Sequence, residues 1–280
     1  MVLQVLIKFT AVKRHFKMKN EKIAKHITGW LSRYLDKSGA RGFVVGVSGG
    51  VDSALVSVLC AMTGRSTVCV TMPIHQAKSH VARAGEHCSY LVGKYANVTC
   101  ENIDLTAPFD AFAAALPVCG DEARDNLASA NTRSRMRMTA LYHVASLGGL
   151  LVAGTGNKIE DFGVGFFTKW GDGGVDLSPI ADLTKTQVYE LARYVGVCES
   201  ILSAEPSDGL FDTDRTDSMQ LGATYPELEW AMDMAELGFS QSDFTGRKAE
   251  VMDIFIRRKR ANAHKMKPIP VCRIPKGLLV

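Results

Sequence analysis

The sequence has no long apolar run and no paired cysteines, and each absence excludes a class of protein. No stretch reaches the roughly eighteen apolar residues that span a bilayer, so a membrane-spanning protein is not expected. The seven cysteines include no CxxC pair and no metal-ligand spacing. An odd, scattered set of this kind indicates reduced thiols in a reducing compartment, so we expect a cytoplasmic protein without a disulfide framework.

An excess of charge of one sign is also lacking over most of the chain. The 280 residues carry a net charge of +4, with 46% hydrophobic and 22% charged residues, which is ordinary for a globular enzyme. Residues 1–17 contain four basic residues and no acid, so residues 18–280 are neutral as a whole. No nucleic-acid partner is therefore expected.

The first seventeen residues differ from the rest of the chain. They are basic and partly apolar, as targeting segments are, but they lack the A-x-A-like cleavage site of a secretory signal. We interpret residues 1–17 as a leader outside the folded protein, with Met18 as the natural start. Residues 18–280 contain no internal repeat and no low-complexity linker, so we expect them to form a single domain.

Short apolar runs alternate with helical patterns along this domain. Uninterrupted apolar strands separated by helices are typical of a parallel sheet that is covered on both faces. We therefore expect an α/β fold with a doubly wound, Rossmann-like parallel sheet, and ligands beyond the carboxyl ends of its strands. The expected strands are residues 43–47, 66–73, 98–105 and 149–155, the expected helices are residues 20–37, 53–62, 78–96, 127–147 and 184–196, and residues 107–126 are a polar, alanine-rich passage.

The turn after the first expected strand is rich in glycine and hydroxyl groups. Backbone N–H groups of such a turn, with those of the following helix, form a concave anion site. Ser48 and Ser53 add hydroxyl donors, and Asp52 is a candidate magnesium ligand because a cation would have to lie between it and a phosphate. A tight turn with glycines for packing and a serine cap is the structural alternative. The turn GVSGGVDS consists of Gly46, Val47, Ser48, Gly49, Gly50, Val51, Asp52 and Ser53.

Three sequence motifs compete for this turn. The lysine of G-x-x-x-x-G-K-[ST] is missing, which excludes a Walker A loop. GVSGG satisfies G-x-S-x-G, the nucleophile elbow of α/β-hydrolases, in which Ser48 would act with Asp253 and His264. SGGVDS also matches SGGxDS, the pyrophosphatase loop of N-type ATP-pyrophosphatases, at every fixed position. The rest of the chain decides between the last two motifs.

A basic cluster, NTRSRMRM, lies early in the helix expected over residues 127–147. Arg133 and Arg137 share one face of that helix, whereas Arg135 points elsewhere. An exposed pair of arginines can hold a phosphate or a carboxylate. A solvated basic face is the structural alternative.

Polar residues follow the fourth expected strand, where a ligand of an α/β sheet binds. Thr155 is a candidate nucleotide contact, and Glu160 is a candidate second magnesium ligand. Lys169 and Lys185 belong to a stretch rich in glycine and acid, and both are candidates for neutralising phosphate charge. The structural alternatives are a polar helix cap for the first two residues and solvent exposure for the lysines.

Taken in this order and spacing, these segments resemble the NAD synthetase family. The FTKxGDGGxD block belongs to this family, whereas GMP synthetases, argininosuccinate synthetases and tRNA-thiolating enzymes share only SGGxDS. The hydrolase alternative explains none of the downstream blocks, and another ATP-pyrophosphatase ligase is the second alternative. The matching blocks are SGGVDS, NTRSRMR, GTGNKIE, GFFTKWGDGGVDLSPIADLTKTQVYELARYVGV, EPSDGL and a final HK, over roughly residues 20–267.

The resemblance implies an ATP-pyrophosphatase type of sheet and the amidation of deamido-NAD to NAD. ATP would adenylate the substrate with release of pyrophosphate, and ammonia would then displace AMP. The implied ATP contacts are residues 46–53, Thr155, Lys185 and Ser207, the deamido-NAD contacts are Arg133, Lys169, Asp176, His264 and Lys265, the Mg²⁺ ligands are Asp52 and Glu160, and the catalytic residues are Ser48, Asp52 and Lys185. Because many relatives have GTDHAAE where this chain has GTGNKIED, the choice between Glu160 and Asp161 as metal ligand stays open.

The resemblance also bears on the nitrogen donor and on assembly. Glutamine-using members of the family carry a nitrilase-like glutaminase domain ahead of the synthetase. Only about 40 residues precede SGGVDS in this chain, so we expect the ammonia-dependent form. The family forms homodimers with the dinucleotide site at the subunit boundary, which implies a homodimer here.

Overall fold

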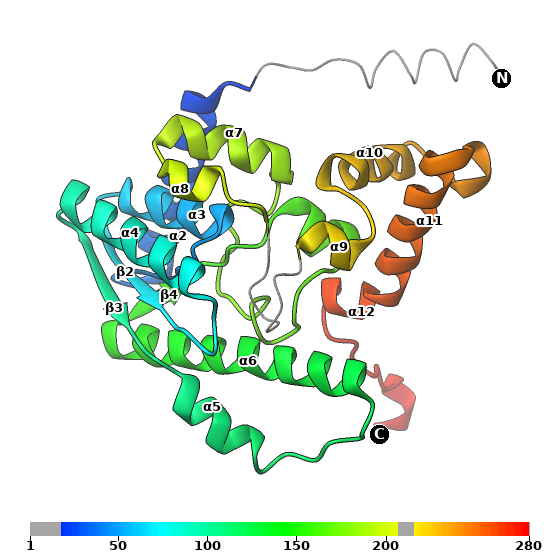
Figure 1. Cartoon of the computed structure of the whole chain (residues 1–280), viewed down its shortest axis with the longest axis horizontal. Helices are drawn as coiled ribbons and strands as arrows, with labels where there is room; N and C mark the ends of the chain where they lie inside the picture. The colour runs from blue at the N-terminus through cyan, green and yellow to red at the C-terminus, as the bar shows by residue number, and fades with distance from the viewer. Residues whose placement is uncertain (1–17, 207–215, 280) are drawn as a thin grey trace.

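The computed structural model of the chain describes residues 18–206 and 216–279 (Figure 1). The interpretation of residues 1–17 as a leader, and the predicted ATP contact Ser207, lie outside the described residues. Within them, the strands form one parallel sheet in the order β3-β2-β1-β4, which confirms the expected α/β fold. The strands are β1 (Gly42–Gly46), β2 (Ser66–Thr71), β3 (Val98–Asn102) and β4 (Leu150–Val152).

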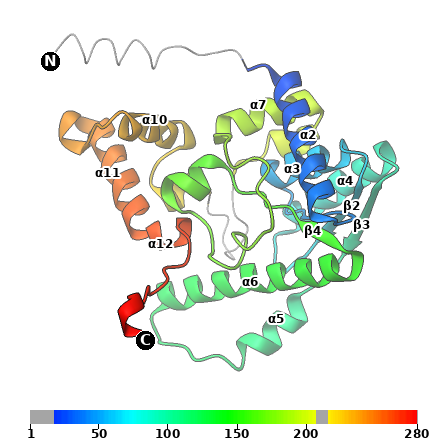
Figure 2. The same ribbon diagram turned by 180° about the vertical axis from the view of Figure 1, so that it is seen from behind.

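Helices cover both faces of the sheet because its residues alternate between two apolar cores. Phe43 and Val45 of β1 belong to a core with α2 (Asn20–Ser38), α3 (Val51–Ala61) and α7 (Lys185–Val195). Val44 of β1, with Val70 of β2 and Val152 of β4, packs against α6 (Glu122–Gly148) on the other face. Figures 1 and 2 show α6 below the sheet and the other three helices above it.

A further apolar core lies beside the sheet layers, where α10 packs on α11 and on a π-helical turn (Figure 2). The turn is the next element after β4, so this core holds the segment beyond the carboxyl end of that strand. Among the described residues, α4 (Lys78–Lys94) also packs on the sheet, against β2 and β3. The other helices are α5 (Thr106–Ala113), α8 (Glu199–Leu202), α9 (Asp217–Leu221), α10 (Tyr225–Glu236), α11 (Gly246–Ala261) and α12 (Ala263–Met266), with the π-helical turn at Ile159–Val164 and 3-10 turns at Gln241–Asp243 and Lys276–Leu278.

The polar, alanine-rich passage over residues 107–126, to which the sequence analysis assigns no element, is partly helical. It contains most of α5, and α6 begins at Glu122, five residues earlier than the expected start. The reason is a cap and not apolar periodicity, since the Asp121 carboxylate accepts hydrogen bonds from the backbone N–H groups of Ala123 and Arg124, each at 3.1 Å. The first turns of α6 are polar and exposed, so a search for an apolar stripe misses them.

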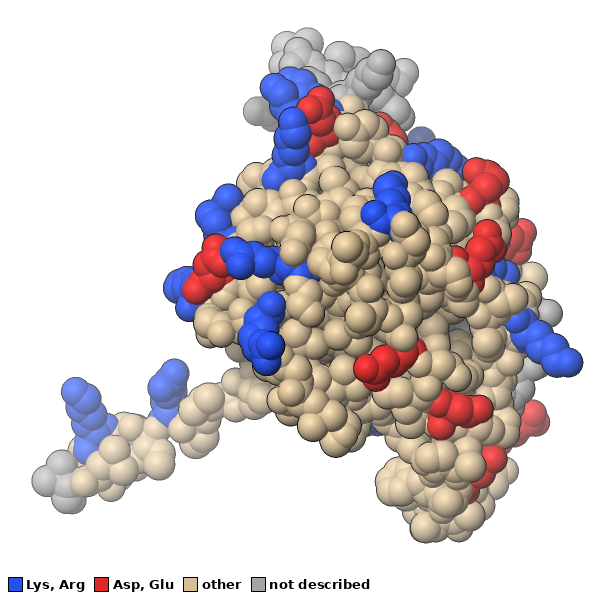
Figure 3. All heavy atoms as spheres, turned by 90° about the vertical axis from the view of Figure 1, so that its left-hand side faces the viewer, with Lys and Arg blue, Asp and Glu red and all other residues tan. Residues whose placement is uncertain are grey.

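The surface seen from the side of β3 and α4 carries little charge at its centre (Figure 3). Lys and Arg side chains are more frequent toward the left margin of this face and Asp and Glu toward the right, with both signs present on each side. Within residues 18–206 and 216–279, no helix is both long and apolar enough to span a membrane.

His87 of α4 is expected to make the stability of the protein depend on pH. Its ring is fully buried with Nε2 2.9 Å from the Ser57 hydroxyl, and burial lowers the pKa of His87 to about 4. The unfolded chain takes up a proton near pH 6.5, whereas the folded chain resists it. The contribution of His87 to the free energy of unfolding is therefore fully present above about pH 6.5. It falls by about 3 kcal/mol as the pH approaches 4.

Urea unfolding of His87→Gln and of the parent protein at several pH values between 7 and 4.5 tests this. We expect the variant to have a smaller free energy of unfolding at pH 7 and a flatter decline on acidification. His26→Gln on α2 is the control, because His26 is exposed and its loss should leave the parent's pH dependence in place. Equal slopes for the parent and His87→Gln would contradict the prediction.

Candidate functional site

The glycine-rich turn joins β1 to α3 at the carboxyl end of the sheet. Gly49 has a φ of 85°, and a Cβ built on it would lie 2.6 Å from the backbone oxygen of His80, so only glycine fits there. The Ser53 hydroxyl donates to the Gly50 carbonyl oxygen at 2.9 Å and accepts from the Ser48 N–H at 3.2 Å. Ser53 thus links the two sides of the turn by hydrogen bonds. The turn leads into the N-terminus of α3, a position that favours anions.

Lys185 at the start of α7 lies between two carboxylates from distant parts of the chain. Its Nζ is 2.6 Å from Asp52 Oδ2 and 3.0 Å from Glu160 Oε1. All three side chains are largely buried, with 6% exposure for Lys185 and 15% for each acid. Burial lowers the pKa of Lys185, but the two carboxylates outweigh this effect and hold that pKa above its ordinary value. The lysine is therefore a fixed positive charge.

Three further side chains complete this buried cluster, and none of them was predicted from the sequence. The Asn157 amide donates to Asp52 Oδ1 at 3.1 Å. The Tyr225 hydroxyl lies 2.5 Å from Glu160 Oε1 and 2.8 Å from Asp217 Oδ2. Because α9 and α10 supply Asp217 and Tyr225, the segment after residues 207–215 is tied to the centre of the site.

Glu160 and Asp161 occupy different environments. Both belong to the π-helical turn, where successive side chains point in different directions. Glu160 shares Lys185 with Asp52, whereas a Cβ on Gly156 would lie 2.2 Å from the Asp161 carboxylate, which places that carboxylate against the backbone after β4. Burial, with the nearby charges of Glu160 and Asp172, raises the pKa of Asp161 to about 8. The geometry thus pairs Glu160, and not Asp161, with Asp52.

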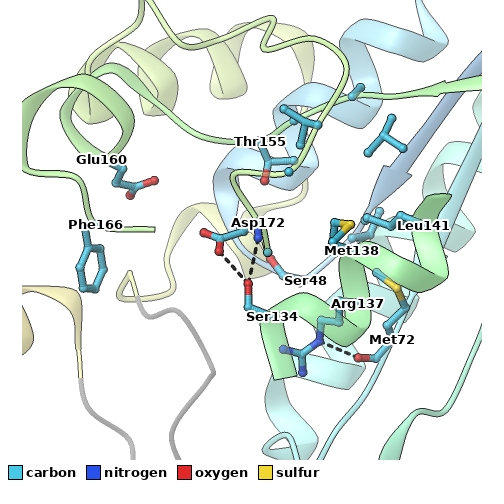
Figure 4. A pocket seen from close by; sticks show the side chains of 18 of the residues that line it. Ser48, Met72, Ser134, Arg137, Met138, Leu141, Thr155, Glu160, Phe166 and Asp172 are labelled. Carbon is cyan, nitrogen blue, oxygen red and sulfur yellow. Dashed lines mark hydrogen bonds between the residues drawn. The ribbon is translucent and has the colours of Figure 1, made fainter. Parts of the chain in front are cut away.

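A large cavity opens beside the cluster, between the sheet and α6 (Figure 4). One wall is apolar, with Met72, Met138 and Leu141 close together. The opposite side is polar, with Glu160 and Lys185 among its lining residues. The other residues of the predicted site that line it are Gly46, Val47, Ser48 and Thr155.

A smaller cavity lies on the α4 side of Lys185. It is lined by the Gly49–Gly50–Val51 backbone at the start of α3, together with Lys185 itself. His80 and Arg83 of α4 also line it, and Arg83 Nε donates to the Gly49 carbonyl oxygen at 3.4 Å. Lys185 therefore borders both cavities, one with an apolar wall and one whose lining combines the amide-rich turn, His80 and Arg83 with the acids Glu205 and Asp217.

The comparison with known proteins identifies the family. The family model for NAD synthase matches residues 23–269. The chain belongs to the NAD synthase family. An NH3-dependent NAD+ synthetase of Carboxydothermus hydrogenoformans is 36% identical over 252 residues, which is 89% of this chain and 96% of that protein. One from Methanosarcina acetivorans is 35% identical over 256 residues, 90% of this chain and 97% of that protein.

A solved structure of this NAD synthase fold also aligns over most of the chain. It is an NMN synthetase from Francisella tularensis, with a TM-score of 0.77 and 29% sequence identity. The alignment covers 92% of this chain and all of that one.

The residues expected to contact the dinucleotide fall into separate groups in this NAD synthase family member. Lys169 Nζ donates to the His264 carbonyl oxygen at 2.9 Å, and Lys265 Nζ donates to the carbonyl oxygens of Gly165 and Phe167 at 3.0 and 2.8 Å. The structure thus brings Lys169, His264 and Lys265 together where α12 meets the loop after the π-helical turn.

Arg133 and Asp176 lie apart from that group. The Arg133 guanidinium is buried with its centre 5.0 Å from the Phe109 ring centroid. Asp176 accepts from the Val152 N–H at 2.8 Å and from the Tyr142 hydroxyl at 3.0 Å, so it braces β4 against α6. The arginine of the NTRSRMRM cluster that lines the large cavity is Arg137, which donates to the Met72 carbonyl oxygen (Figure 4).

The hydrolase alternative is wrong for this NAD synthase family member. Ser48 Oγ lies 3.1 Å from Ser53 Oγ, inside the turn. His264 Nδ1 contacts the Ala261 carbonyl oxygen, and Asp253 pairs with Arg257 on its own helix. The nominated acid and histidine are thus engaged on α11 and α12 and form no triad with the serine.

Proposed function

We propose that this protein amidates deamido-NAD to NAD, using ATP and ammonia and releasing AMP and pyrophosphate. The observation that carries the proposal is the position of Lys185 between two cavities of different chemistry. A nucleoside fits an apolar slot, and phosphates fit amide-rich turns at helix N-termini. The cation of Lys185, at the point where the two cavities meet, would lie next to the α-phosphate of ATP. The α-phosphate is the group that the substrate attacks during adenylation.

The placement of ATP follows from the two linings. The adenosine would occupy the large cavity against Met72, Met138 and Leu141, with Thr155 and Ser48 beside it. The β- and γ-phosphates would extend into the small cavity, against the backbone of Gly49 and Gly50. The Gly50 N–H donates to the Ser48 hydroxyl at 3.2 Å and would exchange this partner for a phosphate oxygen. Arg83, which sequence reasoning missed, would place positive charge beside the departing pyrophosphate, and His80 also lines this cavity. Ser207 stays a predicted ATP contact.

The chemistry then has two steps. A carboxylate oxygen of the nicotinate group attacks the α-phosphorus, and the bond to the bridging oxygen breaks with release of pyrophosphate. Ammonia next attacks the carbonyl carbon of the mixed anhydride, and AMP leaves with the bonding electrons while the nitrogen loses a proton. Lys185 stabilises the negative charge that builds up during the first step, as a preorganised cation can do in a site shielded from water. The second step requires positioning of ammonia.

Asp52 and Glu160 are the residues that would hold Mg²⁺. Both offer hard oxygen donors, and the two carboxylates lie close together because each is within 3.0 Å of Lys185 Nζ. Mg²⁺ sites commonly use one or two carboxylates plus substrate phosphates, so the pair is sufficient even though no group of three acidic, histidine or cysteine ligands occurs among the described residues. When bound, Mg²⁺ screens the triphosphate from the incoming carboxylate.

Deamido-NAD would bind where α12 meets the loop over residues 165–174. Lys169, His264 and Lys265 are the proposed contacts there. A third cavity, lined by Lys265 with Asp161 and Asp172, adjoins this loop. Arg133 and Asp176 stay predicted contacts, and each would need to exchange its present partner for the dinucleotide.

Ammonia as nitrogen donor is supported by the relatives, which match over nearly their whole length and are named NH3-dependent. A mononucleotide substrate is a second candidate, because the aligned Francisella tularensis protein is an NMN synthetase. The two substrates share the nicotinate carboxylate and differ in the adenylate half, so the same reaction serves both. The cytoplasmic location expected from the scattered thiols stays a prediction.

Product analysis of the purified protein tests these proposals together. Each reaction contains MgATP and either deamido-NAD or nicotinate mononucleotide, with ammonium or glutamine as donor. We expect NAD, AMP and pyrophosphate in equal amounts with deamido-NAD and ammonium alone. Preferred turnover of the mononucleotide would assign the second substrate. ATP consumption without either amide would contradict both, and equal rates with glutamine would contradict ammonia dependence.

We also propose a homodimer formed through α5 and α6. The outer sides of these helices and the link between them expose apolar side chains, among them Phe112, Leu116, Val118, Leu127 and Leu147. Exposed apolar groups gathered on neighbouring elements are typical of an association surface. Figures 1 and 2 show that both helices lie on the outside of the molecule, below the sheet.

Sedimentation velocity tests this surface. We expect a species of about twice the 30.4 kDa chain mass for the parent and a single-chain species for Leu127→Glu. Val92→Glu on α4 is the matched control, because Val92 is also an exposed apolar residue but lies on a different helix, and it should leave the dimer intact. A parent protein that sediments as one chain would overturn the proposal.

A further inference from the structure

Three cysteines from three elements meet between α4 and the edge of the sheet, and none of them lines the cavities described above. Cys69 of β2 and Cys100 of β3 are register partners in a parallel pair, so their side chains project from the same face of the sheet. Cys88 belongs to α4, which packs on both strands. The Cys100 thiol donates to the Cys88 carbonyl oxygen at 3.6 Å.

The three thiols differ in access to solvent. Cys69 is fully buried and Cys88 is 7% exposed, whereas Cys100 is partly exposed. β3 is an edge strand of the sheet, so Cys100 belongs to the outermost strand on this side. The neighbouring Cys69 and Cys88 thiols lower the pKa of the Cys100 thiol. Of the three, Cys100 therefore combines access with thiolate character, the two properties that govern cysteine reactivity.

We propose that Cys100 and Cys88 form a reversible redox site that hydrogen peroxide, a two-electron oxidant, converts to a disulfide. The Cys100 thiolate attacks one peroxide oxygen, the O–O bond breaks, and the departing hydroxide takes up a proton to become water. Cys100 is then a sulfenic acid. The Cys88 sulfur attacks the Cys100 sulfur, the S–S bond forms, and the hydroxyl leaves with the Cys88 proton as a second water. Two thiols and one peroxide thus give one disulfide and two waters, and a small dithiol reverses the bond by exchange.

Cys88 is the resolving residue because its helix can approach, whereas Cys69 is held away. Neighbouring strands lie about 4.8 Å apart. Because the Cα–Cβ bonds of two register partners point in the same direction, their Cβ atoms are separated by about the same distance. A disulfide needs Cβ atoms about 3.8 Å apart, so a bond from Cys100 to Cys69 would have to distort the hydrogen-bonded ladder. The Cys88 backbone already touches the Cys100 sulfur, and α4 is a surface helix without such a ladder.

Disulfide mapping of the full-length protein tests the assignment. Cys119 and Cys272 are exposed and Cys198 is partly exposed, so all three are first replaced by serine to remove competing thiols. Trypsin then places Cys69, Cys88 and Cys100 in separate peptides, residues 66–78, 84–94 and 95–124. Each variant is treated with hydrogen peroxide, alkylated and digested without reductant, and its thermal unfolding is recorded beforehand to verify folding. The unsubstituted protein is mapped in parallel.

We expect a peroxide-dependent species in which peptides 84–94 and 95–124 are joined, with two free thiols lost, and its disappearance on treatment with dithiothreitol. Adding Cys88→Ser or Cys100→Ser should abolish the linked species, whereas Cys69→Ser should leave it. In the Cys88→Ser variant, a sulfenic-acid probe should label peptide 95–124. A link to peptide 66–78, labelling spread equally over all thiols, or no link at a peroxide excess that oxidises free thiols would overturn the proposal. Because the readout is mass, it does not depend on the proposed enzymatic function.

Discussion

Replacement of Lys185 by methionine is expected to lower the rate of NAD formation by about 10³-fold. The change removes the positive charge that borders both cavities, and the loss of one preorganised electrostatic group in a catalytic site costs about 10²–10³-fold. It also leaves Asp52 and Glu160 buried and facing one another. Breaking a buried ion pair in this way costs about 3–5 kcal/mol of stability. The variant therefore needs a test that separates inactivity from unfolding.

Urea unfolding of Lys185→Met provides that separation, and the double variant Asp52→Asn with Lys185→Met tests the cause of its loss of stability. Removing one of the two facing charges should restore most of the free energy of unfolding, measured in urea, while product formation stays as low as in Lys185→Met. Lys158→Met is the matched control, because Lys158 pairs with the fully exposed Asp182 at 3.7 Å and should affect the rate by less than about twofold. A folded Lys185→Met protein that retains a tenth or more of the parent rate would contradict the proposed role.

Much of the site was predictable because its signals are local in the sequence. The turn over residues 46–53 lies between a buried strand and a helix. Its conformation depends only on residues close in the sequence, namely a glycine at a positive φ and a serine that hydrogen-bonds within the turn. Thr155 and Glu160 follow β4, where the topology of a parallel sheet brings ligand contacts together. Lys185 was found through the unusual composition of its segment, and its place between Asp52 and Glu160 is what the structure adds.

The residues that were missed reach the site through tertiary contacts alone. Tyr225 begins α10 beside a capping box, and this local motif predicts a helix start without indicating that the hydroxyl meets Glu160. Asp217 lies in the first turn of a short helix, a common place for an acid. Arg83 is one basic residue among several on α4, and only the approach of that helix to Gly49 gives it a role. No spacing in the sequence encodes these approaches.

Gly49→Ala is expected to destabilise the protein by about 3 kcal/mol and to abolish most ATP-dependent activity. A backbone with φ of 85° is costly for alanine, by about 1–2 kcal/mol. The added methyl group would also lie 2.6 Å from the His80 carbonyl oxygen and 3.2 Å from the Ala84 nitrogen, so α4 or the turn must move. Either movement changes the small cavity in which the β- and γ-phosphates are proposed to bind.

Gly50→Ala is the matched control for this prediction. Gly50 has a φ of −95°, which alanine adopts readily, and its added Cβ would meet only the Ser48 hydroxyl at 3.4 Å. We expect the free energy of unfolding of Gly50→Ala to stay within about 0.5 kcal/mol of the parent value, whereas that of Gly49→Ala falls. Titration calorimetry of ATP binding to the two folded variants then measures how much the turn contributes to nucleotide affinity. If Gly49→Ala bound ATP as the parent does, the small cavity would not be the phosphate site, and the contact between the turn and α4 would serve packing alone.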